Sequence, residues 1–285
     1  MQLTVMVQNL GRGAVLDGAG NSENRWPLLL ERIAAHRPDL VLAQELEQWD
    51  RDGMKLLCQA EKDLDMEGLL PPSDSGRGPG LLYRRETMGR RTAWKCDDNA
   101  RETHHGFGVA AFDIGLPAPL AVASVHLTPW GADKAVVEAQ YVASRVYRYG
   151  PYAMAGGDVN YSPAESWPEP EYGNQKPYNR GARTLLGDPE TAGPPQADRR
   201  VAWKLRQNGL HDAARLVHER TGDASVLART GTDDRIDQLW VSSPLAPAVV
   251  SYQLLDTPAG ASDHHGLVVV LDTALVATDN PWTYT

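Results

Sequence analysis

The sequence has few cysteines, which excludes two kinds of stabilising cross-link. Only Cys58 and Cys96 occur among its 285 residues, far apart and with no CxxC or HxxxH pair of the kind that forms a structural zinc site. Isolated cysteines of this kind indicate free thiols in a reducing compartment rather than a disulfide framework.

Long apolar runs are also absent from the sequence. No run approaches the ~20 residues that a bilayer-spanning helix needs, so we expect no membrane span. The first strand-like run begins at Gln2, with no charged segment, apolar segment or cleavage site before it, so we expect no signal peptide. Together with the free cysteines, these absences predict a cytoplasmic protein.

A surplus of positive charge is missing too. The net charge of -9 at pH 7 argues against a strongly electropositive surface for nucleic acid. Nucleic acid is still compatible with this charge, because bound divalent cations can supply positive charge locally.

Strand-like and helix-like runs alternate along the chain. Apolar or alternating runs predict strands over 3–10, 40–43, 81–83, 106–114, 120–126, 152–155, 236–241, 248–255 and 266–271. Apolar residues at helical spacing predict helices over 25–36, 52–61, 132–149, 199–207 and 212–219. Residues 84–100 show no clear pattern.

No repeat, coiled coil or clear linker divides the chain. We therefore predict a single α/β domain over residues 1–285, and we expect a monomer. Residues 161–200 contain seven prolines and little periodicity. Loops of this length are uncommon in compact domains, and those that occur are usually functional or disordered. We therefore predict a long irregular insert over 161–200, beside the active site.

The stretch from Gly156 to Asn160 holds the most suggestive polar pair. Its two glycines follow an apolar run, where they allow a tight turn and leave room for a bulky ligand. Asp158 and Asn160 are two residues apart, so in an extended chain both side chains point to the same side. An anion and an amide together suit a site that handles a water and a phosphate oxygen. The same Gly-Asp-Xaa-Asn pattern is also ordinary turn chemistry.

Other polar residues fall at the ends of apolar runs, where open α/β sheets place ligands. They are Asn9, Glu45, His126 and the triplet 262–264, and Asp237 lies inside the run 236–241. Each has a structural alternative: an asparagine in a turn, a solvent-facing glutamate, an edge histidine or a polar turn. Their occurrence together favours a shared site.

Six segments that contain these residues resemble motifs of the endonuclease/exonuclease/phosphatase superfamily, which has the DNase I-like fold. The segment 38–45 is similar to the family's PDIVxLQE motif, and 157–160 is similar to GDFN. The others resemble the Asn-bearing first strand, the His-bearing strand, the RIDY motif and the C-terminal SDH: 7–10, 125–127, 235–237 and 262–264. The resemblance implies a four-layer α/β sandwich, with two packed mixed β-sheets flanked by helices.

The sequence departs from the family's pattern at three places. Gln238 stands where tyrosine is common, Val159 replaces phenylalanine, and His265-Gly266 replaces the Arg-Pro that often follows SDH. None of these changes removes a chemically reactive group, so they bear on the subfamily rather than on activity.

The resemblance implies metal-dependent hydrolysis of a phosphate ester by an activated water. Glu45 would be the main ligand of Mg²⁺, for which Mn²⁺ could substitute, and Asn9 and Asp263 would assist directly or through water. Asp158 would hold and polarise the attacking water, and Asn160 would donate to a phosphoryl oxygen.

Two histidines complete the implied catalytic set. The family analogy pairs Asp237 with His264, and a carboxylate partner favours the imidazolium form of histidine. His264 would then bind the phosphate as a cation or act as a base, a role for which Asp158 competes. His126 would be a second phosphate contact or the acid for the leaving group.

Further residues near this set could bind the substrate. Trp130 and Tyr178 could stack on a base or sugar or, equally, cover the core, and Arg180 and Arg183 are candidates for a second phosphate. We predict a phosphodiesterase, in particular a nuclease. The alternatives are a phosphatase or phosphodiesterase of a small phosphorylated metabolite, which the acidic charge favours, and a non-catalytic binding module.

Overall fold

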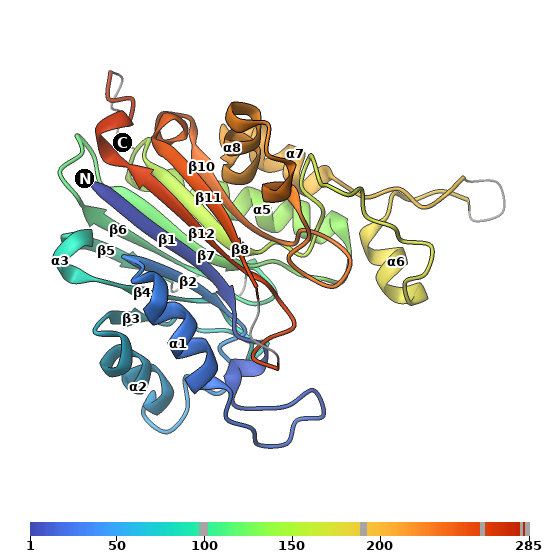
Figure 1. The fold of residues 1–285 in the computed structure, drawn as a ribbon, viewed down its shortest axis with the longest axis horizontal. Helices are drawn as coiled ribbons and strands as arrows, with labels where there is room; N and C mark the ends of the chain where they lie inside the picture. Colours follow the sequence, from blue (N-terminus) through green and yellow to red (C-terminus); the bar gives the residue numbers. More distant parts are fainter. Residues whose placement is uncertain (97–101, 189–192, 257–259, 280–281, 283–285) are drawn as a thin grey trace.

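Two six-stranded mixed β-sheets stack face to face in the computed structural model, which describes residues 1–96, 102–188, 193–256, 260–279 and 282 (Figure 1). The first sheet has the strand order β11-β12-β1-β2-β4-β3. Its strands are β1 (Gln2–Asn9), β2 (Leu40–Gln44), β3 (Glu67–Leu69), β4 (Gly80–Tyr83), β11 (Val249–Leu255) and β12 (Gly266–Asp272). In this sheet β1 and β2 run parallel, and the other neighbours are antiparallel.

The second sheet has the strand order β5-β6-β7-β8-β10-β9. Its strands are β5 (Arg90–Lys95), β6 (Gly108–Asp113), β7 (Leu120–His126), β8 (Ala153–Asp158), β9 (Leu210–Asp212) and β10 (Asp237–Ser242). Here β7 and β8 form the parallel pair. The last residues of β1 and β8, Asn9 and Asp158, are in contact, so the parallel pairs of the two sheets end at the same edge.

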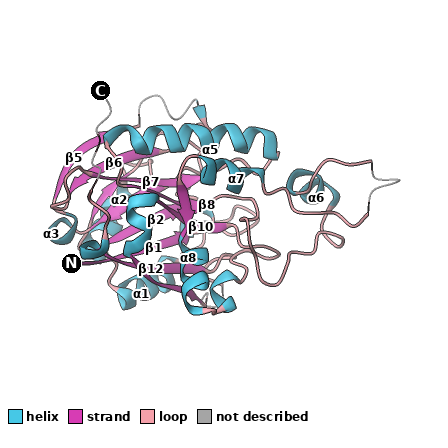
Figure 2. Cartoon of the chain, turned by 90° about the horizontal axis from the view of Figure 1, so that it is seen from above, coloured by secondary structure: helices cyan, strands magenta, loops and turns pink. Residues whose placement is uncertain are grey.

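Helices cover the outer faces of both sheets. Helices α1 (Trp26–His36) and α2 (Lys55–Leu64) pack on the first sheet, and α5 (Ala132–Val146) and α7 (Arg200–Gln207) pack on the second. Figure 2 shows α5 and α7 on one side of the sheets and α1 on the other. Helix α8 (Ala213–Thr221) packs against β10 and β11 at the side of the sandwich. This arrangement confirms the predicted four-layer α/β sandwich.

The remaining helical segments within the described residues are short. They are α3 (Arg85–Met88), α6 (Pro177–Arg183) and the 3₁₀ turns Arg12–Ala14, Tyr147–Tyr149, Ala224–Leu227, Ser243–Ala248 and Thr273–Leu275. None of the described helices is long and apolar enough to cross a membrane.

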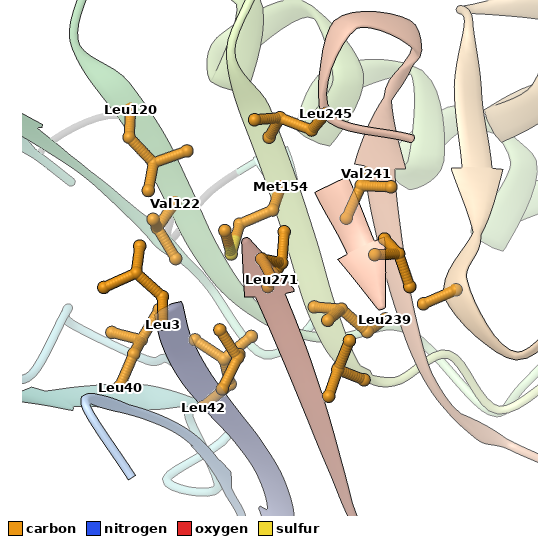
Figure 3. Packing of buried hydrophobic residues seen from close by; sticks show 14 of the residues in the cluster. Leu3, Leu40, Leu42, Leu120, Val122, Met154, Leu239, Val241, Leu245 and Leu271 are labelled. Atoms are coloured by element: carbon orange, nitrogen blue, oxygen red, sulfur yellow. The ribbon is translucent and has the colours of Figure 1, made fainter. Parts of the chain in front are cut away.

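The alternation of side chains along each strand builds the layers. On β1, Leu3, Val5 and Val7 point into the core between the sheets, whereas Met6 points outward to α1 and α2. Figure 3 shows residues of this inner core from both sheets, and each fully buried leucine there contributes ~1.5–3 kcal/mol to stability.

Three parts of the fold differ from the sequence predictions. The strands β3 and β9 were not predicted, because three residues are too few to show an alternation. The unassigned segment forms α3 and the edge strand β5, whose first three residues are exposed, while residues 97–100 lie outside the described residues. Helix α2 begins at Lys55 rather than at Asp52, because Asp52 and Met54 have φ of 49° and 62°, which a right-handed helix excludes.

The predicted insert is largely irregular, as expected, and residues 189–192 of it lie outside the described residues. It holds α6 and one antiparallel bridge between Thr184 and Ala197. Figure 1 shows the part that carries α6 projecting beyond the sandwich. Within the first half of the insert, the Tyr172 hydroxyl donates to Asp234 Oδ2 over 2.7 Å, which ties the insert to the loop before β10.

Candidate active site

On several strands, the apolar side chains that face the core between the sheets are followed by a polar side chain at the strand's end, at one edge of the sandwich. Asn9 lies two residues after Val7 on β1, and Asp158 lies four residues after Met154 on β8, so both point between the sheets. Asp237 begins the antiparallel neighbour β10, where it pairs in register with Asp158. Strand parity therefore brings these three side chains together.

Two glycines make room for this arrangement. A Cβ atom at Gly156 would lie 2.7 Å from both Leu42 Cδ1 and Leu239 Cδ1, so any larger residue there would push these two leucines aside. Gly157 has φ of +148°, and a Cβ atom there would lie 1.9 Å from the Val125 carbonyl oxygen. The close approach of β7 and β8 beside Asp158 therefore requires a residue without a side chain.

Asp158 is the centre of the site. Its Oδ2 accepts from Asn9 Nδ2 at 3.3 Å and lies 3.5 Å from His126 Nε2 and 4.0 Å from His264 Nε2. Its Oδ1 accepts from the backbone N–H of Asn160 at 2.9 Å. The sequence predicted all five residues for the site, and the structure places all five together.

His264 and Asp237 form a buried hydrogen-bonded pair. His264 Nδ1 lies 2.8 Å from Asp237 Oδ2, while its Nε2 faces Asp158. Burial disfavours the charged imidazole, but the Asp237 carboxylate outweighs this effect and raises the pKa of His264 to about 10. His264 is therefore an imidazolium at neutral pH.

Two opposed influences act on the pKa of the Asp158 carboxyl. Burial raises the pKa of Asp158, while the positive charges of His126 and His264 act to lower it. The balance lies above the ordinary value for aspartate, which makes Asp158 a better proton acceptor than an exposed carboxylate.

Asn160 is held on two sides. Its Nδ2 donates to the Leu127 carbonyl at 2.8 Å, and its Oδ1 accepts from Arg183 Nη2 at 3.2 Å. Its backbone has φ of +64°, a conformation that asparagine tolerates better than most residues. One of its two amide N–H groups is thus committed to the backbone, which leaves one for a phosphoryl oxygen.

The other predicted metal ligands lie beside this cluster. Glu45 and Asp263 line one cavity of about 480 Å³. Burial acts to raise the pKa of Glu45, but His126 and the Arg12 amide, which donates to Oε2 at 2.8 Å, produce a net lowering. Glu45 is therefore an anion at neutral pH. Asn9 accepts from the Gly11 amide through Oδ1 at 2.9 Å and lies against Asp158.

A second group of side chains could also hold a cation. One ligand atom from each of Asp158, Asp237 and His264 lies within 4.8 Å of the others. Asp237 Oδ1 is buried and has no hydrogen-bond partner among the described residues. However, Asp237 Oδ2 and His264 Nδ1 already bind each other, so a cation there would compete with a hydrogen bond.

The four predicted substrate-binding residues separate into two groups. Trp130 and Tyr178 are 71% and 65% exposed, which rules out the alternative that they cover the core. Trp130 Nε1 donates to His104 Nε2 at 3.0 Å, which places the indole near the loop beside His126. Arg183 contacts Asn160, whereas Arg180 lines a separate cavity together with Arg200.

One neighbour of the site was not predicted. The ring of His105 stacks on that of His126, with centroids 3.7 Å apart and planes 6° apart. His105 Nδ1 bonds Ser75 Oγ at 2.7 Å, and burial lowers the pKa of His105 to about 2, so this ring is neutral. No local pattern in the sequence marks His105, because its role depends on a strand from elsewhere in the chain.

The departures from the family's pattern have structural explanations. Gln238 points away from Asp158, where its Nε2 donates to the Tyr161 carbonyl at 2.8 Å and its Oε1 accepts from Trp240 Nε1 at 2.9 Å. A Cβ atom at Gly266 would lie 2.4 Å from Gln8 Oε1. Val159 packs in the core under α5 and α7.

The family model of the endonuclease/exonuclease/phosphatase family matches residues 8–264. The chain belongs to this family. The match spans every catalytic and metal-binding residue predicted above, from Asn9 to His264, and identifies a phosphoesterase of this family.

Solved structures of the same fold agree with this family. The 3′ phosphatase NExo from Neisseria, bound to product DNA hairpin, aligns over 95% of this chain and 99% of its own, with a TM-score of 0.65 and 16% identity. D. rerio TDP2, complexed with single strand DNA product, aligns over 95% and 99%, with a TM-score of 0.59 and 14% identity. AP endonuclease LMAP from Leishmania major aligns over 95% and 87%, with a TM-score of 0.62 and 14% identity. No curated protein sequence matches the chain.

Proposed function

We propose that this phosphoesterase is a divalent-metal-dependent phosphodiesterase that cleaves nucleic acid. The observation that carries the proposal is the convergence of Asp158 with Asn9, His126, His264 and Asn160 at one edge of the sandwich. A binding module would not need this complete set of reactive groups, so the arrangement supports catalysis.

Asp158 is the proposed base. A water held by its Oδ2 would lose a proton to a buried carboxylate whose pKa is raised, and its oxygen would attack the phosphorus. His264 does not compete for this role, because an imidazole with a pKa of about 10 already carries its proton at neutral pH.

The cationic and amide groups would stabilise the phosphate. The His264 imidazolium would bind a phosphoryl oxygen, and the free amide N–H of Asn160 would donate to another. His126 Nδ1 lies 3.3 Å from the Arg77 carbonyl, to which it can donate, so its Nε2 faces the reaction centre beside Asp158. His126 would act there as a phosphate contact or leaving-group acid.

The residues fit a hard divalent cation, which we propose to be Mg²⁺, with Mn²⁺ as a substitute. Glu45 and Asp263 offer carboxylate oxygens in one cavity, and Asn9 adds an amide nearby. We favour this position over Asp158, Asp237 and His264, because the hydrogen bond between the last two is already formed. When bound, such an ion offsets negative charge on the phosphoryl and leaving oxygens.

Nucleic acid is the substrate class that the surroundings support best. Trp130, near the loop beside His126, exposes a large aromatic face on which an unpaired base can stack, and Tyr178 exposes another on the projecting insert. Two structurally similar proteins are described as complexes with DNA products. The net charge of -9 favours the alternative, a phosphatase or phosphodiesterase of a small phosphorylated metabolite.

A substrate panel tests the proposal. Strand cleavage and phosphate release are measured with Mg²⁺ or Mn²⁺ on single- and double-stranded DNA, RNA, mononucleotides, and inositol and sugar phosphates, with EDTA as the control. Metal-dependent cutting of a polymer is expected. Turnover of monoesters alone would assign the small-molecule function, and silence across the panel would refute both.

A further inference from the structure

Arg183 is brought to the active site by the base of the insert. It is the last residue of α6, and its carbonyl accepts from the Asp198 amide at 2.8 Å. The next two residues continue this ladder, with Thr184 bridged to Ala197 and the Leu185 amide bonded to the Gln196 carbonyl at 2.9 Å. Because Asp198 leads directly into α7, the backbone of Arg183 is tied to the sandwich.

The side chain of Arg183 has one partner and spare capacity. Its Nη2 donates to Asn160 Oδ1, and among the described residues it makes no other side-chain hydrogen bond and no ion pair. The group is half-buried, permanently charged and carries five N–H donors. Its partner Asn160 is neutral, so among the described residues Arg183 pairs with no anion and keeps donors that fit the paired oxygens of a phosphate.

The position of Asn160 identifies the missing anion. Asn160 lies two residues after Asp158 and donates its backbone N–H to Asp158 Oδ1, so Arg183 is one side chain away from the proposed base. The positive charge of Arg183 also acts on the Asp158 carboxyl. An anion that contacts both Asn160 and Arg183 would therefore lie near Asp158, the residue proposed to hold the attacking water.

We propose that Arg183 is a catalytic residue, whose guanidinium binds a non-bridging oxygen of the reacting phosphate while Asn160 positions it. This role differs from the second phosphate suggested by the sequence, and it rests on the proposed phosphodiesterase function. In the reaction the water oxygen forms a new P–O bond, the ester P–O bond breaks, Asp158 takes the water proton and the leaving oxygen takes a proton from His126. Arg183 exchanges no proton and offsets charge on the phosphoryl oxygens.

The test compares Arg183→Ala, Arg183→Lys and a matched control, Arg85→Ala. Arg85 lies on α3 at the opposite end of the sandwich, paired with Glu67 and 81% exposed. Turnover of a short single-stranded DNA is measured with Mg²⁺, giving kcat and KM separately. Binding of inorganic phosphate is measured by calorimetry on the same proteins.

We expect Arg183→Ala to lower kcat about 100-fold and to weaken phosphate binding roughly 10-fold or more. Arg183→Lys should recover only part of both, because an ammonium replaces a planar fork by a point charge. Arg85→Ala should match the wild type. An unchanged kcat, or a raised KM alone, would overturn the proposal.

The two readouts separate the failure of this inference from that of the proposed function. A wild-type protein that cleaves no phosphate ester would refute the phosphodiesterase function. The calorimetry alone would then decide whether Arg183 binds an anion. Weaker phosphate binding by Arg183→Ala would still support the anion site, whereas equal binding would overturn it.

Discussion

Asp237→Asn should change the charge of His264 without changing the shape of the site. The substitution replaces one carboxylate oxygen with an amide group of the same size, 2.8 Å from His264 Nδ1. The Asp237 carboxylate is the largest influence that raises the pKa of His264 to about 10, against the effect of burial. Its removal therefore isolates one electrostatic interaction.

The size of the effect follows from the distance. At 2.8 Å and an effective dielectric constant of ~20, two unit charges interact by ~6 kcal/mol, which equals a pKa change of ~4. The pKa of His264 should therefore fall from about 10 to ~6 or below in the variant. The wild-type imidazole should stay protonated up to about pH 10, whereas the variant should lose its proton at pH ~6.

The assay is an NMR titration of histidine Cε1–Hε1 resonances in metal-free wild type and Asp237→Asn. The His264 resonance is identified as the one that is absent from the spectrum of the His264→Gln variant. His211, whose pKa burial lowers, bonds Ser243 at the far end of β10 and serves as the internal control. With metal restored, turnover of the variant should decline as pH rises through ~6, since it then loses its cation. A His264 midpoint near 6.5 in the wild type, or the same midpoint in both proteins, would refute the reasoning.

Three further substitutions give separable outcomes. Gly157→Ala should lower the free energy of unfolding by about 4 kcal/mol in chemical denaturation, because the new Cβ atom would clash with the Val125 carbonyl. The control Gly181→Ala should leave it unchanged, because a Cβ atom there has no neighbour within 4 Å. His105→Ala should lower kcat by up to ~10-fold because the ring that stacks on His126 is lost, and His105→Phe should restore kcat. A kcat of His105→Ala equal to that of the wild type would contradict a positioning role for His105. Glu45→Gln should weaken Mg²⁺ binding at least ~10-fold in calorimetry with the metal-free melting temperature unchanged; equal affinity would place the ion elsewhere.

The order of strands and helices could be predicted from local patterns, whereas the four-layer sandwich and the roles of the site residues rested on the resemblance of six short segments to the family's motifs. Strand parity places Asn9, Asp158 and Asp237 on the inward face, and parity is visible in the alternation of each run. The motifs around Glu45 and His264 lie in short contiguous segments, so they also needed no knowledge of contacts between distant residues.

The parts that were missed depend on long-range contacts. The stack of His105 on His126 joins a loop to β7, and the bond from Gln44 Nε2 to Ser124 Oγ at 3.0 Å joins the two sheets. Arg183 was predicted, but its partner was not, because the ladder that carries it to Asn160 closes only when the insert folds back onto α7. Likewise, only the structure shows that Gln238 points away from Asp158 and so leaves the catalytic set complete.

Asp158→Asn provides the most direct measurement of the central claim. Single-turnover cleavage of the preferred panel substrate is measured with Mg²⁺ for the wild type and this variant, with circular dichroism to verify the fold. Loss of the proposed base should reduce the rate by at least ~10³-fold, while the wild type should be silenced by EDTA and restored by Mg²⁺. A folded Asp158→Asn variant that cleaves at the wild-type rate would contradict the account.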